Sequence, residues 1–100
     1  MTRDEVLDRA RVCVSGEREQ DYGSPEQNFK TIALLWSVYI QRRGRGYLDD
    51  KDVAAMLSLL KIARIASGNA KADNWIDLAG YAACGGEIES NAEEVQVNQD

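Results

Sequence analysis

The last third of the chain carries short polar side chains at helical spacing, in the run KADNWIDLAGYAACGGE at residues 71–87. Asn74, Asp77 and Tyr81 stand at i, i+3 and i+7. Asp73 lies one turn before Asp77, so a helix presents all four side chains from one face. Asp and Asn are poor helix formers that hold their oxygens close to the backbone, whereas solvated faces favour long Lys and Glu side chains. The pattern therefore predicts a polar ligand site, with a merely solvated face as the alternative.

A pair of cations could complement these acids. Lys61 and Arg64 stand at i and i+3 within an otherwise apolar run, LLKIARIA. Cations in such a run either extend their charged ends to water or meet carboxylates and phosphates. We expect both side chains to bind the substrate, and a surface position is the alternative.

A second anion-binding element is expected in the stretch EQDYGSPEQNF. Asp-Tyr-Gly followed by Ser-Pro predicts a fixed turn that leads into a helix, whose free N-terminal amides favour an anion such as phosphate. Asp21, Tyr22 and Asn28 are the substrate-binding residues that we assign to this element. A capped turn without a ligand is the alternative.

The residue types that are absent restrict the chemistry. The chain contains no histidine, and its two cysteines, Cys13 and Cys84, are far apart in the sequence. This excludes an imidazole base, a Ser/His/Asp triad and a zinc site. Any catalysis has to use carboxylates, most plausibly with Mg²⁺ and phosphate oxygens. Asp73 and Asp77 on the polar face are the candidate carboxylates for such chemistry.

Four helices would position these residues, at about residues 3–15, 25–42, 50–66 and 71–89. The composition, rich in Ala, Leu, Glu and Arg with a single proline, predicts an all-α fold. Thr2 with Glu5 forms a capping-box pattern, Pro25 takes the preferred first helical position, and Asp49 or Asp50 caps the third helix. The basic loop RRGRGY before that helix is expected to be a surface linker, with a phosphate contact as the alternative.

Apolar residues mark the buried face that we expect on each of the last three helices. The second helix carries Phe29, Ile32, Ala33, Trp36 and Ile40. The third carries Val53, Met56, Leu57, Leu60 and Ala63, widened by Leu59, Ile62 and Ile65. The fourth carries Trp75, Leu78, Ala79, Ala82 and Gly86, opposite its polar face. Because apolar residues cover most of its circumference, the third helix is expected to be central or to pack against a second subunit.

The size and charge of the chain complete the expected architecture. One hundred residues with 44% apolar content suit one compact helical domain, residues 1–90, which is marginal alone, so we expect oligomerisation to complete the bundle. Residues 91–100 are expected to form an acidic tail without regular structure. The whole net charge of −5 comes from five acids in residues 87–100, because residues 1–86 hold 12 acids against 12 bases. The two cysteines lie in apolar helical context and are expected to be buried and reduced. With neither a signal peptide nor a membrane span evident in the sequence, we expect a cytoplasmic protein.

Several ordered motifs resemble one protein family. They are DYGSPEQNF, IALLWSVY, DVAAMLSLLKIARI and ADNWIDLAGYAACGGE. Together, over roughly residues 17–90, they resemble small phage and prophage proteins described as MazG-like nucleotide pyrophosphohydrolases, which are related to nucleotide-modification-associated phage domains. The resemblance implies an all-α bundle that works as a dimer or tetramer in the host cell cytoplasm.

The same resemblance implies a magnesium site for a nucleoside triphosphate. In the family, an ExxE pair on one helix and an ExxD pair on a later helix bind magnesium. Asp77 matches the aspartate of ExxD, whereas Asn74 replaces its glutamate. The resemblance therefore implies that Asp77, together with Asp73, is catalytic and binds Mg²⁺. Lys61 and Arg64 stand where ExxE is expected. Replacing carboxylates by cations removes metal ligands and favours direct anion binding, so the resemblance carries the fold further than the hydrolysis.

The sequence therefore leads to two hypotheses. The first is a phage-type MazG-like protein that binds, and in its active form hydrolyses, nucleoside triphosphates or related nucleotides with Mg²⁺, as a homo-oligomer in which a dimer is favoured. The second is a small acidic phage-encoded inhibitor that binds a host protein such as a defence (anti-CRISPR-like) nuclease complex, with its acidic end resembling a nucleic-acid backbone. Neither hypothesis involves a membrane.

Overall fold

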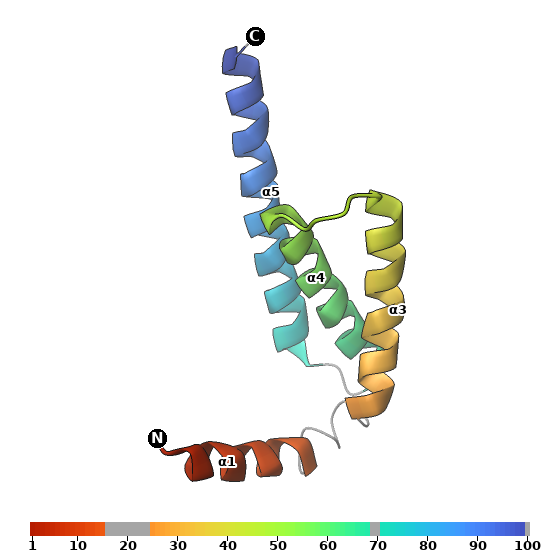
Figure 1. Ribbon diagram of the computed structural model, residues 1–100, viewed down its shortest axis with the longest axis vertical. Coiled ribbons are helices and arrows are strands. Elements are labelled where there is room, and N and C mark those ends of the chain that lie inside the picture. Colours follow the sequence, from red (N-terminus) through yellow and green to blue (C-terminus); the bar gives the residue numbers. More distant parts are fainter. Residues whose placement is uncertain (16–24, 69–70, 100) are drawn as a thin grey trace.

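The computed structural model describes residues 1–15, 25–68 and 71–99, and this part of the chain forms α-helices without any strand (Figure 1). The helices are α1 (Arg3–Ser15), α3 (Pro25–Arg43), α4 (Asp50–Ala66) and α5 (Ala72–Gln99). The all-α prediction is confirmed. All four helices begin within one residue of the predicted starts.

Side-chain caps fix the starts of two helices as the sequence predicts. At α1, the Glu5 backbone N–H donates to the Thr2 hydroxyl over 3.2 Å, and the Thr2 N–H donates to the Glu5 carboxylate over 3.4 Å. At α4, Asp49 is the cap: its carboxylate accepts from the Asp52 N–H over 2.9 Å, and the Asp52 carboxylate accepts from the Asp49 N–H over 2.9 Å. Each reciprocal pair satisfies amides that a helix end leaves unpaired.

The end of α5 differs from the prediction. The helix continues to Gln99, ten residues beyond the expected end at residue 89, so residues 91–99 are helical and do not form an irregular tail. After Gly86 the sequence contains no further glycine and no proline, while Glu, Ala and Gln are favourable helix residues. Nothing in the local sequence therefore stops the helix.

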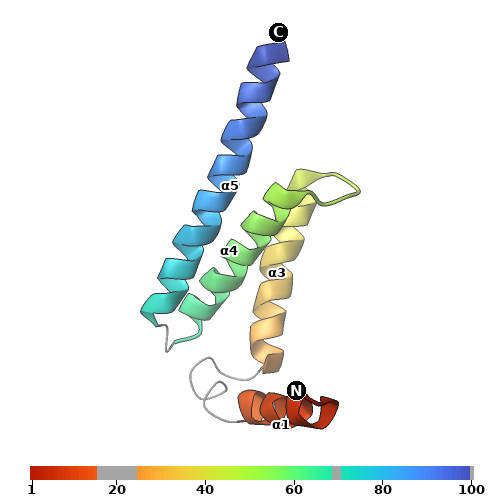
Figure 2. The same ribbon diagram turned by 90° about the vertical axis from the view of Figure 1, so that its left-hand side faces the viewer.

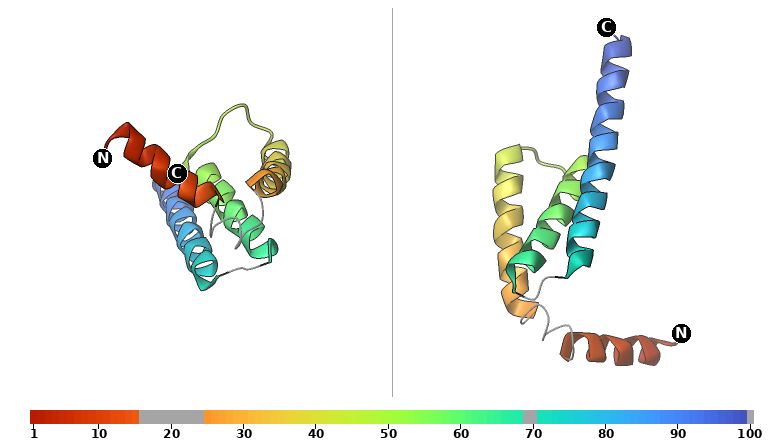
Figure 3. Two further views of the ribbon diagram at one scale, coloured as in Figure 1. Left: turned by 90° about the horizontal axis from the view of Figure 1, so that it is seen from below. Right: turned by 180° about the vertical axis from the view of Figure 1, so that it is seen from behind.

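Three helices form a layer with α4 in the middle. Figures 1 and 2 show α3 and α5 on either side of α4, each running antiparallel to it, which confirms the predicted central position of this helix. The last turns of α5 project beyond the layer. Figure 3 shows α1 to one side of the other helices, and all of its residues are exposed. The packed unit is therefore α3–α4–α5.

A buried carboxylate joins α3 to the start of α4. Asp52 is only 1% exposed and accepts hydrogen bonds from the Tyr39 hydroxyl over 2.6 Å and from Arg43 Nε over 3.0 Å. Arg45 Nη2 lies 2.6 Å from the other carboxylate oxygen. The basic loop thus holds the α3–α4 hairpin together, because two of its arginines neutralise one buried acid.

The environment of Asp52 changes its acidity and that of its neighbour. The hydrogen bond from Tyr39, followed by those from the Asp49 N–H and Arg43, holds the pKa of Asp52 well below its usual range. Burial, and then the hydrogen bond to Asp52, raise the pKa of Tyr39 above 10.0. Asp52 therefore stays ionised, and Tyr39 stays protonated, over the whole physiological range.

The apolar contacts beside this cluster are few. Met56 and Ala63 of α4 are the hydrophobic residues of the described chain that are buried, at 8% and 3% exposed. Trp36 of α3 donates its indole N–H to the backbone carbonyl oxygen of Met56 over 2.7 Å. The α3–α4 contact therefore rests on directed polar bonds as much as on apolar burial.

Helices α4 and α5 approach each other at a glycine. A Cβ atom built on Gly85 would lie 3.3 Å from the Cβ of Ala54, which is closer than an ordinary van der Waals contact. At Gly80 and Gly86 an added Cβ would meet nothing within 4 Å. Of the three glycines of α5, Gly85 alone is thus required by the contact with α4.

Several predicted core residues lie at the surface instead. On α3, Phe29 is 67% and Ile40 is 40% exposed, and Ala33 is exposed as well. On α5, Trp75 is 59% exposed. The side of the helix that is buried combines part of the polar face, Asn74 and Tyr81, with Leu78 and Gly85. The predicted core faces of these helices are therefore corrected: the apolar stripe of α3 is only half covered, and that of α5 is mostly open.

The cysteine prediction is also wrong, since Cys13 and Cys84 are both exposed free thiols. Cys13 lies on α1, whose residues are all exposed, and Cys84 lies at an exposed position of α5. Among the described helices, none combines the length and the hydropathy that crossing a bilayer requires.

Asp52→Asn is expected to lower the melting temperature by about 10 °C at pH 7, because two arginines lose their buried counter-charge. Asp50→Asn, an exposed change in the same helical turn, should have little effect. Since the folded state lowers the pKa of Asp52, its contribution is complete above the unfolded pKa of about 4 and is lost as the pH falls below it. Melting curves by circular dichroism between pH 3 and 7 test this. A constant gap between the two proteins across that range would contradict it.

Gly85→Leu is expected to unfold or strongly destabilise the chain, because the leucine side chain would force α4 and α5 apart. Gly80→Leu is the matched control on the same helix: it enters open space and should raise the melting temperature by removing a helix glycine. Thermal denaturation of both variants distinguishes the two positions. Equal melting temperatures would show that the close approach at Gly85 is not needed.

Candidate functional site

The polar face of α5 packs against α4 and brings two of the predicted site residues together. Asn74 is 2% exposed, and Tyr81 and Gly85 further along this face are half-buried. The Nζ atom of Lys61 on α4 lies 2.8 Å from Oδ2 of Asp77 on α5. One cation and one acid assigned from the sequence therefore form a direct ion pair.

The two members of this pair differ in exposure. The side chain of Lys61 is 10% exposed and that of Asp77 is 48% exposed. A buried ammonium group loses its hydration and requires a counter-charge, which Asp77 provides. The site thus combines a buried cation with a carboxylate that solvent reaches.

Asn74 adds a buried donor one helical turn before Asp77. Its backbone N–H donates to the carbonyl oxygen of Lys71 over 3.0 Å, but its side-chain Nδ2 has no hydrogen-bond partner among the described residues. A buried amide without a partner costs about 1–3 kcal/mol. An acceptor oxygen that entered the site would recover this energy.

The other predicted site residues are distributed around this pair. Asp73 is exposed on the first turn of α5, Arg64 is half-buried one turn after Lys61, and Asn28 is half-buried on the first turn of α3. The start of α3, the end of α4 and the start of α5 lie at the same end of the layer (Figures 1 and 3). Asp21 and Tyr22 lie outside the described residues.

The acids of this region offer few ligands to a metal ion. Within the described ranges, no three His, Cys, Asp or Glu side chains gather in a way that could hold a metal. Asp73 and Asp77, at i and i+4, provide two carboxylates at most, and Asp77 is paired with Lys61. Mg²⁺ often binds through one or two carboxylates together with water and phosphate oxygens. These residues therefore fit Mg²⁺ only when a phosphorylated ligand shares it.

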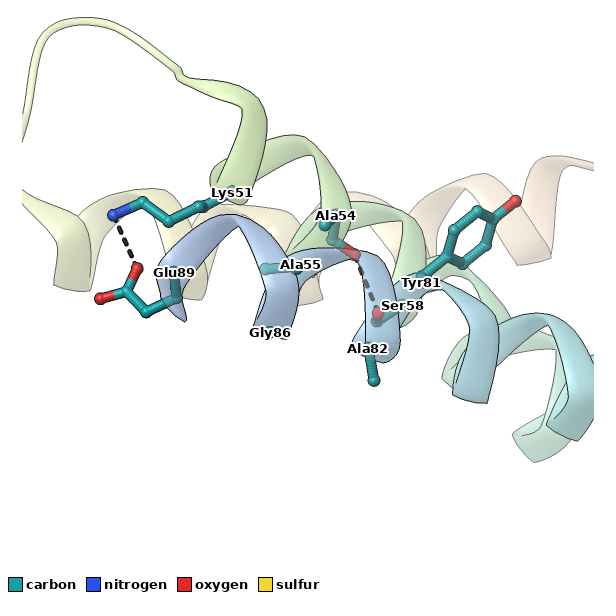
Figure 4. Close-up of a pocket in the computed structure, with 9 residues that line it drawn as sticks. Lys51, Ala54, Ala55, Ser58, Tyr81, Ala82, Gly86 and Glu89 are labelled. Atoms are coloured by element: carbon teal, nitrogen blue, oxygen red, sulfur yellow. Dashed lines mark hydrogen bonds and ion pairs between the residues drawn. The ribbon is translucent and has the colours of Figure 1, made fainter. Parts of the chain in front are cut away.

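A groove lies further along the same two helices (Figure 4). Its volume is about 250 Å³, and the residues that line it are Lys51, Ala54, Ala55, Ser58, Tyr81, Ala82, Gly85, Gly86 and Glu89. Lys51 Nζ lies 2.7 Å from Glu89 Oε2 at one end, and Tyr81 lies at the other. Tyr81 therefore belongs to this groove, and the volume suits one aromatic ring system better than a whole nucleotide.

Two features of the structure, the groove and the Asp52 cluster, were not predicted from the sequence. The groove depends on small residues of α4 and α5, whose alanines and glycines carry no chemical signal of their own. The Asp52 cluster had a signal, because an Asp pair spaced as a capping box directly follows an arginine-rich loop. That pattern predicts a paired carboxylate, but only the folded hairpin shows that Tyr39 joins it.

Comparison with known proteins identifies the family of this chain. Residues 5–89 match the family model described as Domain of unknown function (DUF6378). The chain is 42% identical over 79 residues to the Gene 55 protein of Mycobacterium phage D29. The aligned residues make up 79% of this chain and 50% of that protein. It is also 42% identical over 77 residues to the Gene 55 protein of Mycobacterium phage L5, covering 77% and 47% respectively.

These matches extend the sequence analysis in one respect. Both relatives are phage proteins, in agreement with the phage part of the resemblance, and neither printed name states an activity or a ligand. The chain spans about half the length of these curated relatives. No solved structure matches the chain. Since the family model covers most of its length, the chain belongs to the family described as Domain of unknown function (DUF6378).

Proposed function

We propose that this chain is a phage MazG-like protein that binds the phosphate groups of a nucleotide beside the Lys61–Asp77 pair, in the cytoplasm of the host cell. The observation that carries the proposal is the buried, unpartnered Nδ2 of Asn74, one turn before Asp77, which is paired with the buried Lys61. A donor and a cation that are both held inside the protein suit an anionic oxygen ligand.

The arrangement of the surrounding helices supports an anion at this position. A phosphate would accept a hydrogen bond from Asn74 Nδ2 and share the charge of Lys61 with Asp77. The first turns of α3 and α5 lie at the same end of the layer, and helix N-termini favour negative charge. Arg64, one turn after Lys61, adds a second positive charge to this end.

The charge balance supports binding more than rapid hydrolysis. Asp77 is paired with Lys61, so a metal ion would have to compete with the lysine for this carboxylate. When bound together with phosphate, Mg²⁺ would be held by Asp73 and Asp77 and would reduce the negative charge of the phosphate oxygens. The protein's own residues would then orient the phosphate: Lys61 by charge and Asn74 by its amide N–H.

Titration calorimetry with nucleoside triphosphates and with inorganic tripolyphosphate, each with and without Mg²⁺, tests this proposal. We expect binding that Lys61→Met and Asn74→Leu each weaken by about tenfold or more, since each removes one buried donor. Lys51→Met is the matched control, because it removes an ion-paired lysine from the same helix at the other end. Undetectable binding, or equal losses in all three variants, would contradict the proposal. Pyrophosphate release in the same samples reports on hydrolysis.

A second candidate function uses the other end of α5. Beyond Glu89 the helix projects past the layer, and its acidic residues Glu93 and Glu94 are exposed (Figures 1 and 2). This acidic projection would suit a basic surface on a host protein, such as a nucleic-acid-binding site of a defence nuclease.

Deleting residues 91–100 separates the two functions. The proposed nucleotide site lies at the opposite end of α5, so the truncated chain should bind nucleotide with unchanged affinity. The inhibitor role predicts that the truncated chain no longer protects a phage from a nuclease defence that the full chain blocks. A truncated chain that still protects would exclude the projecting end as the inhibitory surface.

A further inference from the structure

The ring of Phe29 on α3 is a large apolar side chain at the surface, and neither candidate function uses it. The sequence predicts this residue in the core, but it is 67% exposed. Single exposed apolar side chains are common on proteins, so only its position relative to other groups can give the ring a role. That position is defined by the level of Phe29 along the helices and by the side of the layer on which it lies.

The contact between α3 and α4 fixes the level of Phe29. Trp36 Nε1 donates to the Met56 carbonyl oxygen over 2.7 Å, so these two residues lie side by side. Because the helices are antiparallel, a step back along α3 matches a step forward along α4 (Figure 1). Phe29 is seven residues before Trp36 and is therefore level with Ala63, seven residues after Met56. Lys61 of the proposed phosphate site is two residues from Ala63, or about 3 Å along the axis, so the ring and the site share one level.

Phe29 lies on the same side of the α3–α4 pair as Val53. A two-fold axis perpendicular to the layer relates two antiparallel helices, so the residue after each contact residue lies on the same side in both. Ile40 follows Tyr39, and Val53 follows Asp52, the residue that Tyr39 contacts. Ile40 and Val53 are 40% and 48% exposed, so this side is open. Phe29 is eleven residues, or about three turns, before Ile40 and belongs to the same stripe of α3.

The proposed phosphate site opens on this same side. Between α4 and α5, the residue before each contact residue shares a side, by the same symmetry. Leu60 directly precedes Lys61 on α4, and Asp77 directly precedes Leu78, which is half-buried on α5. Leu60 is seven residues, or about two turns, after Val53 and continues its side of α4. Asp77 therefore lies on the side of the layer that carries the exposed ring.

We propose that the base of the bound nucleotide stacks on the ring of Phe29 while its phosphates lie at Lys61 and Asn74. This inference rests on the proposed function, because it locates the base of the same ligand. The axes of packed helices are about 8–10 Å apart, so α3 and α5 are separated by the width of α4. An extended nucleoside triphosphate spans such a width. Leu60, half-buried on α4, would lie beneath its sugar.

The described residues around the ring select a large base rather than one particular base. Ala33, one turn after Phe29, and Leu60 on α4 have no side-chain group that could hydrogen-bond to the edge of a base. Stacking accepts any base, and preferences among bases then follow the strength of stacking. Purine nucleotides should therefore bind more tightly than pyrimidine nucleotides, with adenine and guanine nearly equal.

Titration calorimetry of the full chain with ATP, UTP and inorganic tripolyphosphate, each with Mg²⁺, tests the stacking. We expect Phe29→Ala to weaken ATP binding by about tenfold and to leave tripolyphosphate binding unchanged, because only ATP carries a base. Phe29→Trp should retain ATP binding, and the preference for ATP over UTP should shrink in Phe29→Ala. Leu34→Ala is the matched control, since Leu34 is 69% exposed on another side of α3 and should not affect either ligand.

The outcomes separate this inference from the proposed function. Tripolyphosphate binding together with unchanged ATP affinity in Phe29→Ala would overturn the stacking and leave the phosphate site standing. Equal losses for ATP and tripolyphosphate would assign Phe29 a structural role, which circular dichroism and the milder Phe29→Leu would report. A chain that binds neither ligand would overturn both proposals.

Discussion

Two charged side chains buried on opposite sides of α4 determine how the other helices are arranged. Asp52 faces α3 and Lys61 faces α5, and both residues are buried. A charge removed from water requires a partner, and removing that partner costs more than most apolar contacts supply. The position of Arg43 at the end of α3 and that of Asp77 on α5 are therefore fixed by the same requirement. The α3–α4–α5 layer satisfies both charges at once.

This arrangement explains why so much apolar surface remains outside. Since α5 directs Asp77 towards Lys61, Trp75 is left 59% exposed. Gly85 allows the two helices to meet closely at Ala54. The charges thus set the orientation of α5 and leave apolar side chains such as Trp75 exposed.

The parts of this fold that could be predicted are those with a local cause. Helix starts follow from caps such as Asp49, and the central position of α4 follows from the apolar residues around its circumference. The pairing of Lys61 with Asp77 follows from opposite charges at helical spacing. The orientation of α5 could not be predicted, because its polar and apolar faces are both plausible contacts until the buried charge on α4 is known. The Tyr39 contact with Asp52 joins residues that only the hairpin brings together.

Hydrogen exchange measured by mass spectrometry tests most directly whether α4 is the element on which the structure depends. Exchange slows where opening requires the loss of buried interactions, and it is fast where a helix stands alone. We expect the amides between Asp52 and Lys61 to exchange most slowly. We expect α1 and the end of α5 beyond Glu89 to exchange fastest. Exchange in α4 as fast as in α1 would contradict the claim that its buried charges hold the layer together.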